Sequence, residues 1–318
     1  MVNTTKQNKK TAKKTGNFSK QTCLPAGKSW KQYNESLINR GTCLIDISFL
    51  KKQEEELAQM NKNKMGAPYK CTNSQIEFLA GLYVGFDIPY RSVQGVCRGL
   101  SEIVRIPELH FTQIRRRILK LETEINNLNL DDTVELVFDS SGLSTTNRGT
   151  YLEDKWKRQK REYVKLHVSV DVKTKKIVSY KITHGHSSDT KQFIPLFKEA
   201  KKHCKKIRKS YADKAYDDQN NFDYCDKNKT IPAIRIKNNA VPHRTKSRLR
   251  RKEILYINKY GFERWKKNKD AGKRWIVEIV YSALKRVLGE RLRSKNFDAL
   301  CVEAGLKVLL YNKFLDTG

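Results

Sequence analysis

The chain has 318 residues and carries 65 lysines and arginines against 34 acidic residues, a formal net charge of +31. An excess of this size favours a nucleic-acid partner and argues against an ordinary small-molecule enzyme. No apolar run reaches the roughly 18 residues of a membrane span, and the N-terminus lacks an apolar signal core, so we expect neither membrane insertion nor secretion. The seven cysteines never have CxxC spacing, which argues against disulfides and a zinc site and favours a reducing compartment.

Residues 1–66 are predicted to form a basic tail and connector. Residues 1–33 contain eight lysines and no acid, which is typical of a solvated tail and compatible with a non-specific DNA arm. Residues 30–50 gain aromatic and apolar side chains and are expected to dock on the body. Residues 51–64 are charged and are predicted to be a helical connector.

Residues 67–130 are predicted to form a helical DNA-binding domain. Two prolines divide it into three short helices, and two residues near the start of the first, Thr72 and Ser74, have capping-box spacing to Gln75 and Glu77. The third is expected to be capped by Thr112 and to cover residues 113–126. Its outer face is basic and carries Arg115, Arg116, Arg117 and Lys120. This pattern favours a helix-turn-helix DNA binder; a plain helical bundle whose basic residues face water is the alternative.

Residues 131–318 have a different pattern, in which short alternating strands are followed by helices. Five strands are predicted, at 134–139, 163–171, 176–183, 206–212 and 230–236. Helices are predicted at 189–202, at 219–228 and around residue 278. The order predicts an α/β fold with an antiparallel hairpin inside a mixed five-stranded sheet and flanking helices. The ribonuclease-H-like fold has this order of elements.

Residues 237–270 interrupt this pattern as a basic insertion. The segment has twelve basic and three acidic residues, a net charge of +9, and includes Tyr260 and Trp265 among the cations. A solvated helical insertion is one interpretation. We favour a surface that follows a nucleic-acid backbone with salt-sensitive affinity.

Three acids in apolar settings are the candidate catalytic residues. Asp139 follows a buried strand and precedes the turn-like sequence Ser-Ser-Gly, Asp213 ends the fourth strand, and Glu278 lies on a later helix. The carboxyl ends of neighbouring strands meet at one sheet edge, so Asp139 and Asp213 are expected to lie close together. Mg²⁺ prefers hard oxygen ligands, and two ions about 4 Å apart activate both oxygens of a phosphodiester cleavage. We therefore expect all three carboxylates to hold two Mg²⁺ or Mn²⁺ ions.

The helix of Glu278 also carries two cations on about the same face. Arg274 lies four residues before Glu278 and Lys285 seven residues after it. Cations beside a metal-binding carboxylate suit a groove lined by phosphates.

Each acid also has a structural interpretation. Asp139 could be a turn former, Asp217 and Asp218 compete with Asp213, and Glu278 could simply pair with Arg274. Two further acids are interpreted as structural: Asp171 beside a turn, and Asp189 in a polar loop after the weak metal signal His-Gly-His.

Taken together, several motifs resemble a known family. They are WKQYNESLINRG at 30–41, IPYRSVQG at 88–95, PELHFTQIRRR at 107–117, FDSSGL at 138–143, YVKLHVSVD at 163–171, ADKAYD at 212–217, VPHR at 241–244 and RWIVEIVYSALKRVLGERL at 274–292. From residue 30 to 314 the chain resembles insertion-sequence transposases of the DDE type, a bacterial and archaeal group with a ribonuclease-H-like core.

The resemblance implies a DNA transposase that binds terminal inverted repeats, cleaves DNA with Mg²⁺ or Mn²⁺ and joins the freed 3′ hydroxyl to target DNA. It implies Asp139, Asp213 and Glu278 as metal ligands, Arg274 and Lys285 on phosphates, and Arg244 in a basic loop. It also implies a homodimer or larger complex on double-stranded DNA, in the cytoplasm of a prokaryotic host and associated with its nucleoid. One position departs from the family, because Ala271 replaces a common tyrosine; altered end contacts are expected there.

Two other functions remain open from the sequence. A ribonuclease-H-like nuclease such as a junction resolvase would cut DNA without joining it. A catalytically silent DNA-binding protein derived from a transposase would do neither.

Overall fold

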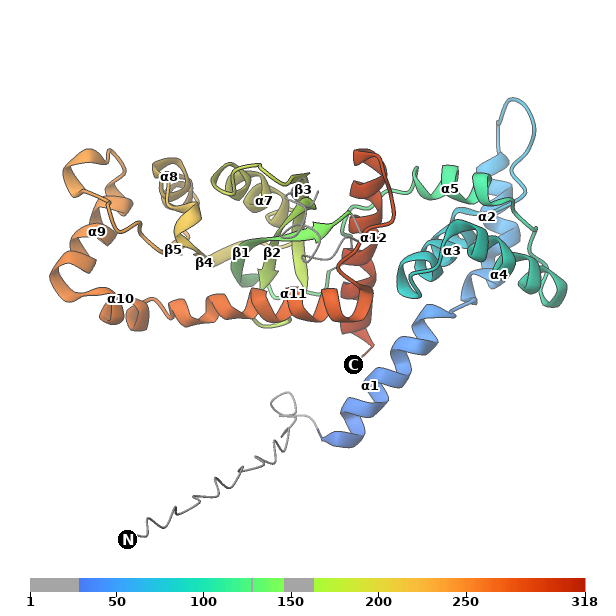
Figure 1. Ribbon diagram of the computed structural model, residues 1–318, viewed down its shortest axis with the longest axis horizontal. Coiled ribbons are helices and arrows are strands. Elements are labelled where there is room, and N and C mark those ends of the chain that lie inside the picture. Colours follow the sequence, from blue (N-terminus) through green and yellow to red (C-terminus); the bar gives the residue numbers. More distant parts are fainter. Residues whose placement is uncertain (1–28, 127, 146–162, 318) are drawn as a thin grey trace, which may run out of the picture.

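The computed structural model describes residues 29–126, 128–145 and 163–317, so most of the predicted basic tail lies outside the described residues. The chain forms a five-stranded mixed sheet with helices on both faces and a helical region at one end (Figure 1). The strands are β1 (Thr133–Ser144), β2 (Tyr163–Asp171), β3 (Ile177–His184), β4 (Lys206–Ala212) and β5 (Ile231–Ile234). Their spatial order is β3-β2-β1-β4-β5.

Strand direction changes at β1. This strand pairs with β2 in antiparallel fashion and with β4 in parallel fashion, while β2–β3 is antiparallel and β4–β5 is parallel. The mixed sheet with an antiparallel hairpin that the sequence predicts is therefore confirmed, and the fold is ribonuclease-H-like.

Two apolar cores cover the two faces of the sheet. On one face β1 places Leu136 and Phe138 against α7 (Phe193–Ala200) and α8 (Gln219–Lys227). On the other face Val137 packs with α11 (Trp275–Leu288) and α12 (Phe297–Asp316). Successive strand residues point to opposite faces, and so the buried central strand is apolar at both.

β1 is longer than predicted. The sequence predicted a turn at Ser140–Gly142, but the strand continues to Ser144 because residues 140–144 pair with the start of β2. A Cβ at Gly142 would lie 3.2 Å from the ring of Tyr163, so the glycine gives this ring room rather than forming a turn. What does end near Asp139 is the pairing with β4, whose last pair is Phe138 with Ala212.

The helical region contains α3 (Asn73–Gly85), α4 (Tyr90–Ile103) and α5 (Phe111–Ile118). Of the two candidate capping residues, Thr72 caps α3 and accepts a hydrogen bond from the backbone of Gln75, whereas Ser74 lies inside the helix. The third helix differs from its prediction, because His110 rather than Thr112 is its N-cap and it ends at Ile118. The apolar spacing that suggested a longer helix arises from an extended segment, in which Ile125 is buried and the backbone oxygen of Thr123 accepts a hydrogen bond from Tyr180 of β3.

The helical region and α12 share polar and apolar contacts. Buried residues of α3 and α5 belong to the same core as those of α11 and α12. The hydroxyl of Tyr83 in α3 donates to the buried carboxylate of Glu303 in α12 at 3.0 Å. Glu303 also accepts backbone hydrogen bonds from Arg293 and Ser294. Because the bonding capacity of Glu303 is used inside the protein, this contact fixes α3 against α12.

The remaining helices lie at the two ends of the molecule. At one end are α1 (Trp30–Leu44), which contacts α3 and α12, and the connector helix α2 (Gln53–Asn61). At the other end, beyond β5, are α9 (Arg248–Tyr260) and α10 (Phe262–Asn268) of the basic insertion (Figure 1). In the described part of the chain no helix is both long and apolar enough to cross a membrane.

Candidate active site

Strand register brings Asp139 and Asp213 together. Phe138 of β1 pairs with Ala212 of β4, and the two aspartates are the next residues of these adjacent parallel strands. Phe138 and Ala212 lie in the core beneath α7 and α8. Because side chains alternate along extended backbone, both aspartates point to the opposite face, on which α11 lies.

The carboxylate of Asp139 is largely enclosed, with a side chain that is 21% exposed. Its Oδ1 accepts a hydrogen bond from the backbone of Ser140 at 2.8 Å, and its Oδ2 lies 3.4 Å from a guanidinium nitrogen of Arg274. Burial raises the pKa of Asp139 to about 6, and the nearby carboxylates of Asp213 and Asp189 add to the shift, whereas the Ser140 N–H and Arg274 oppose it. A cation beside Asp139 would relieve this unfavourable burial of charge.

Arg274 connects Glu278 to Asp139. It precedes Glu278 by one helical turn and forms an ion pair with it while also contacting Asp139. The pairing of Arg274 with Glu278, which was the structural interpretation of Glu278, is therefore present, and the same guanidinium also contacts Asp139. The short helix η5 (Ala271–Arg274), which contains Arg274 and the atypical Ala271, contacts both β1 and β4.

The same short helix neutralises a second acid of β1. Lys273 lies 3.0 Å from Glu135, which also accepts hydrogen bonds from Arg208 and Tyr211. Burial alone would raise the pKa of Glu135, but these hydrogen bonds outweigh burial and hold the pKa at about 2. Glu135 therefore serves to fix η5 on the sheet.

Tyr281 positions α11 and was missed in the sequence. It follows Glu278 by three residues, and its hydroxyl lies 2.9 Å from the backbone oxygen of Asp139 and 3.0 Å from that of Leu166. These two hydrogen bonds fix the distance of α11 from the sheet and its rotation about its own axis, and α11 carries Glu278. The sequence shows only a tyrosine on an apolar helix face, which does not distinguish this role from ordinary core packing.

The structure separates Asp213 from its two neighbours. Asp217 is buried and binds Arg250 through both carboxylate oxygens, at 2.7 and 2.9 Å. Asp218 caps α8. Asp213 makes no side-chain capping bond at the start of the short helix η3 (Lys214–Tyr216). Of the three, Asp213 is therefore the acid that no structural role explains.

The donor chemistry at this edge fits Mg²⁺ or Mn²⁺. Asp139 and Asp213 supply hard oxygen ligands, and the burial of Asp139 beside other acids is the setting that a divalent cation stabilises. Glu278 forms an ion pair with Arg274 in this structure. Within residues 29–126, 128–145 and 163–317, no three His, Cys, Asp or Glu side chains lie close enough together to hold a metal ion. Asp171 is structural as expected, since Thr174 donates two hydrogen bonds to it.

Asp139→Asn is expected to stabilise the metal-free fold at high pH. Because the folded-state pKa of about 6 exceeds the ordinary value of 3.8, the folded chain binds the proton more tightly, so stability falls as pH rises from about 4 through 6. In urea unfolding with EDTA at about pH 8, the variant should be more stable than wild type by up to about 3 kcal/mol. The difference should shrink towards zero near pH 4; equal stability at both pH values would contradict the burial of this charge.

The predicted DNA-binding residues fall into two groups. Arg115, Arg116 and Lys120 are exposed at α5, as is Arg244 in the basic insertion. Arg117 instead donates to the backbone oxygen of Cys71 at 2.6 Å and to Asn73 at 2.7 Å, so its guanidinium joins α5 to the start of α3. Lys285 is partly exposed on α11, with its Nζ 3.9 Å from Glu290.

The basic insertion is anchored by its own ion pairs. Arg250 binds Asp217, and Lys269 binds the buried Glu253. Trp265, which lies among the cations of this segment in the sequence, is buried and donates a hydrogen bond to Glu253, so its ring is not part of the basic surface. The other ten basic side chains of residues 237–270 are exposed.

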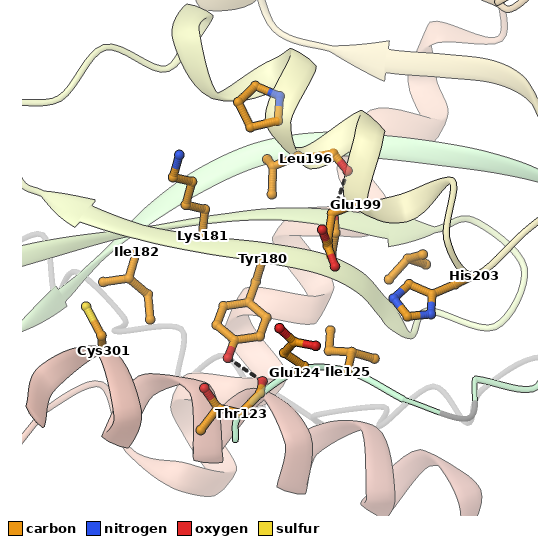
Figure 2. A pocket seen from close by; sticks show the side chains of 13 residues that line it. Thr123, Glu124, Ile125, Tyr180, Lys181, Ile182, Leu196, Glu199, His203 and Cys301 are labelled. Atoms are coloured by element: carbon orange, nitrogen blue, oxygen red, sulfur yellow. Dashed lines mark hydrogen bonds between the residues drawn. The ribbon is translucent and has the colours of Figure 1, made fainter. Parts of the chain in front are cut away.

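A cavity of about 420 Å³ lies elsewhere, between β3, α7 and the extended segment after α5 (Figure 2). Tyr180 crosses it towards Thr123, and Lys181, Glu199 and His203 lie at its sides. None of the candidate catalytic residues lines it.

The mixed five-stranded sheet with helices on both faces places the chain among ribonuclease-H-like folds. Comparison with known families agrees. A family model described as a transposase DDE domain matches residues 131–313, and a second model with the same description matches residues 38–148. The chain belongs to the DDE transposase family.

Proposed function

We propose that the chain binds terminal inverted repeats of a mobile DNA element, cleaves DNA at their ends and joins those ends to target DNA. The observation that carries this proposal is the register of β1 and β4, which sets Asp139 beside Asp213, together with Arg274, which links Glu278 to Asp139. Membership of the DDE transposase family supports it.

Asp139, Asp213 and Glu278 would hold two Mg²⁺ or Mn²⁺ ions. When bound, the ions activate the attacking oxygen and stabilise the leaving oxygen. Arg274 and Lys285, on the side of α11 that carries Glu278, would bind the phosphates on either side of the cut and orient the strand. Arg274 would then exchange its ion pairs for phosphate, which frees both carboxylates for metal.

Binding to double-stranded DNA would use both ends of the molecule. Residues 67–130 would form the domain that reads the repeat through α5, and the basic insertion at 237–270 would follow the backbone of the same or target DNA. Two ends must be held together for joining, so the active form would be a dimer or larger complex.

The test uses purified protein, a duplex with the inverted repeat that flanks the reading frame, Mg²⁺ and a supercoiled plasmid. We expect nicking at the repeat boundary, joining of the 3′ end to the plasmid, and loss of both with EDTA. Cleavage without joining would replace the proposal with a resolvase-type nuclease. Binding without cleavage under any divalent ion would replace it with a silent DNA-binding protein.

Neighbouring arginines of α5 should behave differently. Arg115→Ala and Arg116→Ala remove exposed cations, so each should weaken binding of the repeat and lower the salt dependence by about one ion if it contacts a phosphate. Arg117→Ala should instead lower the free energy of unfolding by about 1–3 kcal/mol, because it leaves the part-buried backbone oxygen of Cys71 without its donor. Binding titrations at several salt concentrations and urea unfolding measure the two effects. Unchanged binding in both exposed-arginine variants would remove α5 from the DNA interface.

A further inference from the structure

Two consecutive residues, Asp189 and Thr190, contact the segments of both candidate catalytic aspartates. They follow β3 and lead into the short helix η2 (Thr190–Gln192) and α7. The sequence suggested only a polar loop for this position. In the structure the side chain of Asp189 contacts β1 and β2, whereas that of Thr190 contacts η3, the short helix that follows β4.

Asp189 acts on the Asp139 side. Its carboxylate accepts a hydrogen bond from the hydroxyl of Ser140 at 2.9 Å, and the backbone of Ser140 donates to Asp139. Lys165 of β2 lies 2.7 Å from the same oxygen and supplies the balancing charge. His167 is also near, but burial lowers its pKa to about 4, so its ring is neutral. Asp189 thus reaches Asp139 through one intervening residue.

Thr190 acts on the Asp213 side. Its hydroxyl donates to the backbone oxygen of Ala215 at 2.6 Å, two residues after Asp213. The side-chain amide of Asn221 then bonds to the backbone oxygens of Thr190 and Tyr216, at 3.3 and 3.0 Å. These bonds hold the turn that begins at Asp213 against the start of η2.

We propose that Asp189 and Thr190 form a clamp that fixes the separation of the Asp139 and Asp213 carboxylates. The two are positioning residues: Asp189 holds the β1 side through Ser140, and Thr190 holds the β4 side through Ala215. β1 and β4 stop pairing at Phe138 and Ala212, so beyond that point the ladder no longer sets the distance. Beyond the last backbone pair of β1 and β4, the side-chain contacts of Asp189 and Thr190 are what fix this separation. This inference rests on the proposed function of the same site.

The contact of Thr190 with Ala215 is tested with a matched pair of variants. Thr190→Val keeps the shape but removes the hydroxyl, whereas Thr190→Ser keeps the hydroxyl. With a repeat duplex under single-turnover conditions, we expect cleavage to slow about 10- to 100-fold in the valine variant, because catalysis is sensitive to misplacements near 1 Å. The serine variant should stay within about 3-fold of wild type. Repeat affinity should be unchanged in both. The midpoint of thermal unfolding should fall by no more than a few degrees in the valine variant, which loses one hydrogen bond, and should be unchanged in the serine variant.

A readout independent of turnover accompanies the rates. Mn²⁺ affinity is measured by electron paramagnetic resonance on the complex with a pre-cut end that lacks its 3′ hydroxyl. Thr190→Val should weaken it about 10-fold, and Thr190→Ser should not. Equal rates and equal Mn²⁺ affinity in wild type and the valine variant would overturn the clamp.

Variants of Asp189 distinguish a positioning role from direct participation in catalysis. Asp189→Asn keeps an oxygen that accepts from Ser140, so cleavage should fall less than about 10-fold, whereas Asp189→Ala should lose about 100-fold. If the asparagine variant is as inactive as Asp139→Asn, Asp189 acts as an acid in its own right and the positioning role is wrong. If wild-type protein does not cleave, it is the proposed function that fails; active wild type with unaffected clamp variants rejects the clamp alone.

Discussion

Asp213→Asn is expected to reduce cleavage at the repeat boundary by at least about 1,000-fold while leaving affinity for the repeat within about 2-fold. The substitution keeps the size of the side chain and removes the charge that would bind metal. Asp213 makes no side-chain capping bond, so the free energy of unfolding should change little. Single-turnover cleavage, repeat binding and urea unfolding, each measured on the same preparation, give the three values.

The matched control is Asp218→Asn, five residues further along the same segment. Asp218 caps α8, so this variant should lose stability by about 1 kcal/mol or less and keep its cleavage rate. If Asp213→Asn cleaves at the wild-type rate, the carboxylates at the β1–β4 edge are not the catalytic acids. An equal loss of rate in both variants would point to general disturbance of the loop.

Arg250→Ala should have the largest effect on stability, a loss of about 3–5 kcal/mol. Arg250 is 12% exposed and its partner Asp217 is fully buried, so the variant leaves a carboxylate buried without its countercharge. Asp217 also accepts a hydrogen bond from the backbone of Lys237, the first residue of the basic insertion. Removing Arg250 should therefore loosen the connection between α8 and α9.

Arg251→Ala is the control for charge, because its side chain is exposed on the same helix. It should change the free energy of urea unfolding by less than about 0.5 kcal/mol. A loss below about 1 kcal/mol in Arg250→Ala would mean that water replaces the guanidinium at Asp217. In that case the insertion is held chiefly by the buried Trp265 and its bond to Glu253.

Much of the sheet could be predicted because its information is local. The sequence predicted β2 and β4 with their observed limits. In β2 the apolar residues recur at every second position, which is the repeat of a strand that places them all on one face. The succession of strands and helices then predicted a mixed sheet that contains an antiparallel hairpin. The approach of Asp139 to Asp213 was predictable for the same reason, because neighbouring parallel strands end at one edge.

The rest depended on contacts between distant segments. Arg117 looks like its neighbours Arg115 and Arg116 in the sequence, and only the position of α3 turns it inward. The helix after residue 113 was predicted too long because an extended segment packed against β3 reproduced the helical spacing. Tyr281 and Asp189 gain their roles from contacts with Asp139 and Ser140 of β1, which are distant from them in the sequence. The catalytic and DNA-binding roles of the named residues stay predictions.

The contact between Tyr83 and Glu303 has a consequence for where DNA is cut. It ties α3 to α12, and the shared apolar core ties α12 to the helix that carries Glu278. If α5 binds the repeat, the distance between the bases that α5 contacts and the phosphodiester that is cleaved is fixed by the protein. One base pair inserted between them moves that phosphate by about 3.4 Å along the duplex. The cut should then stay at a constant count of base pairs from the recognised sequence, whatever sequence lies at the boundary.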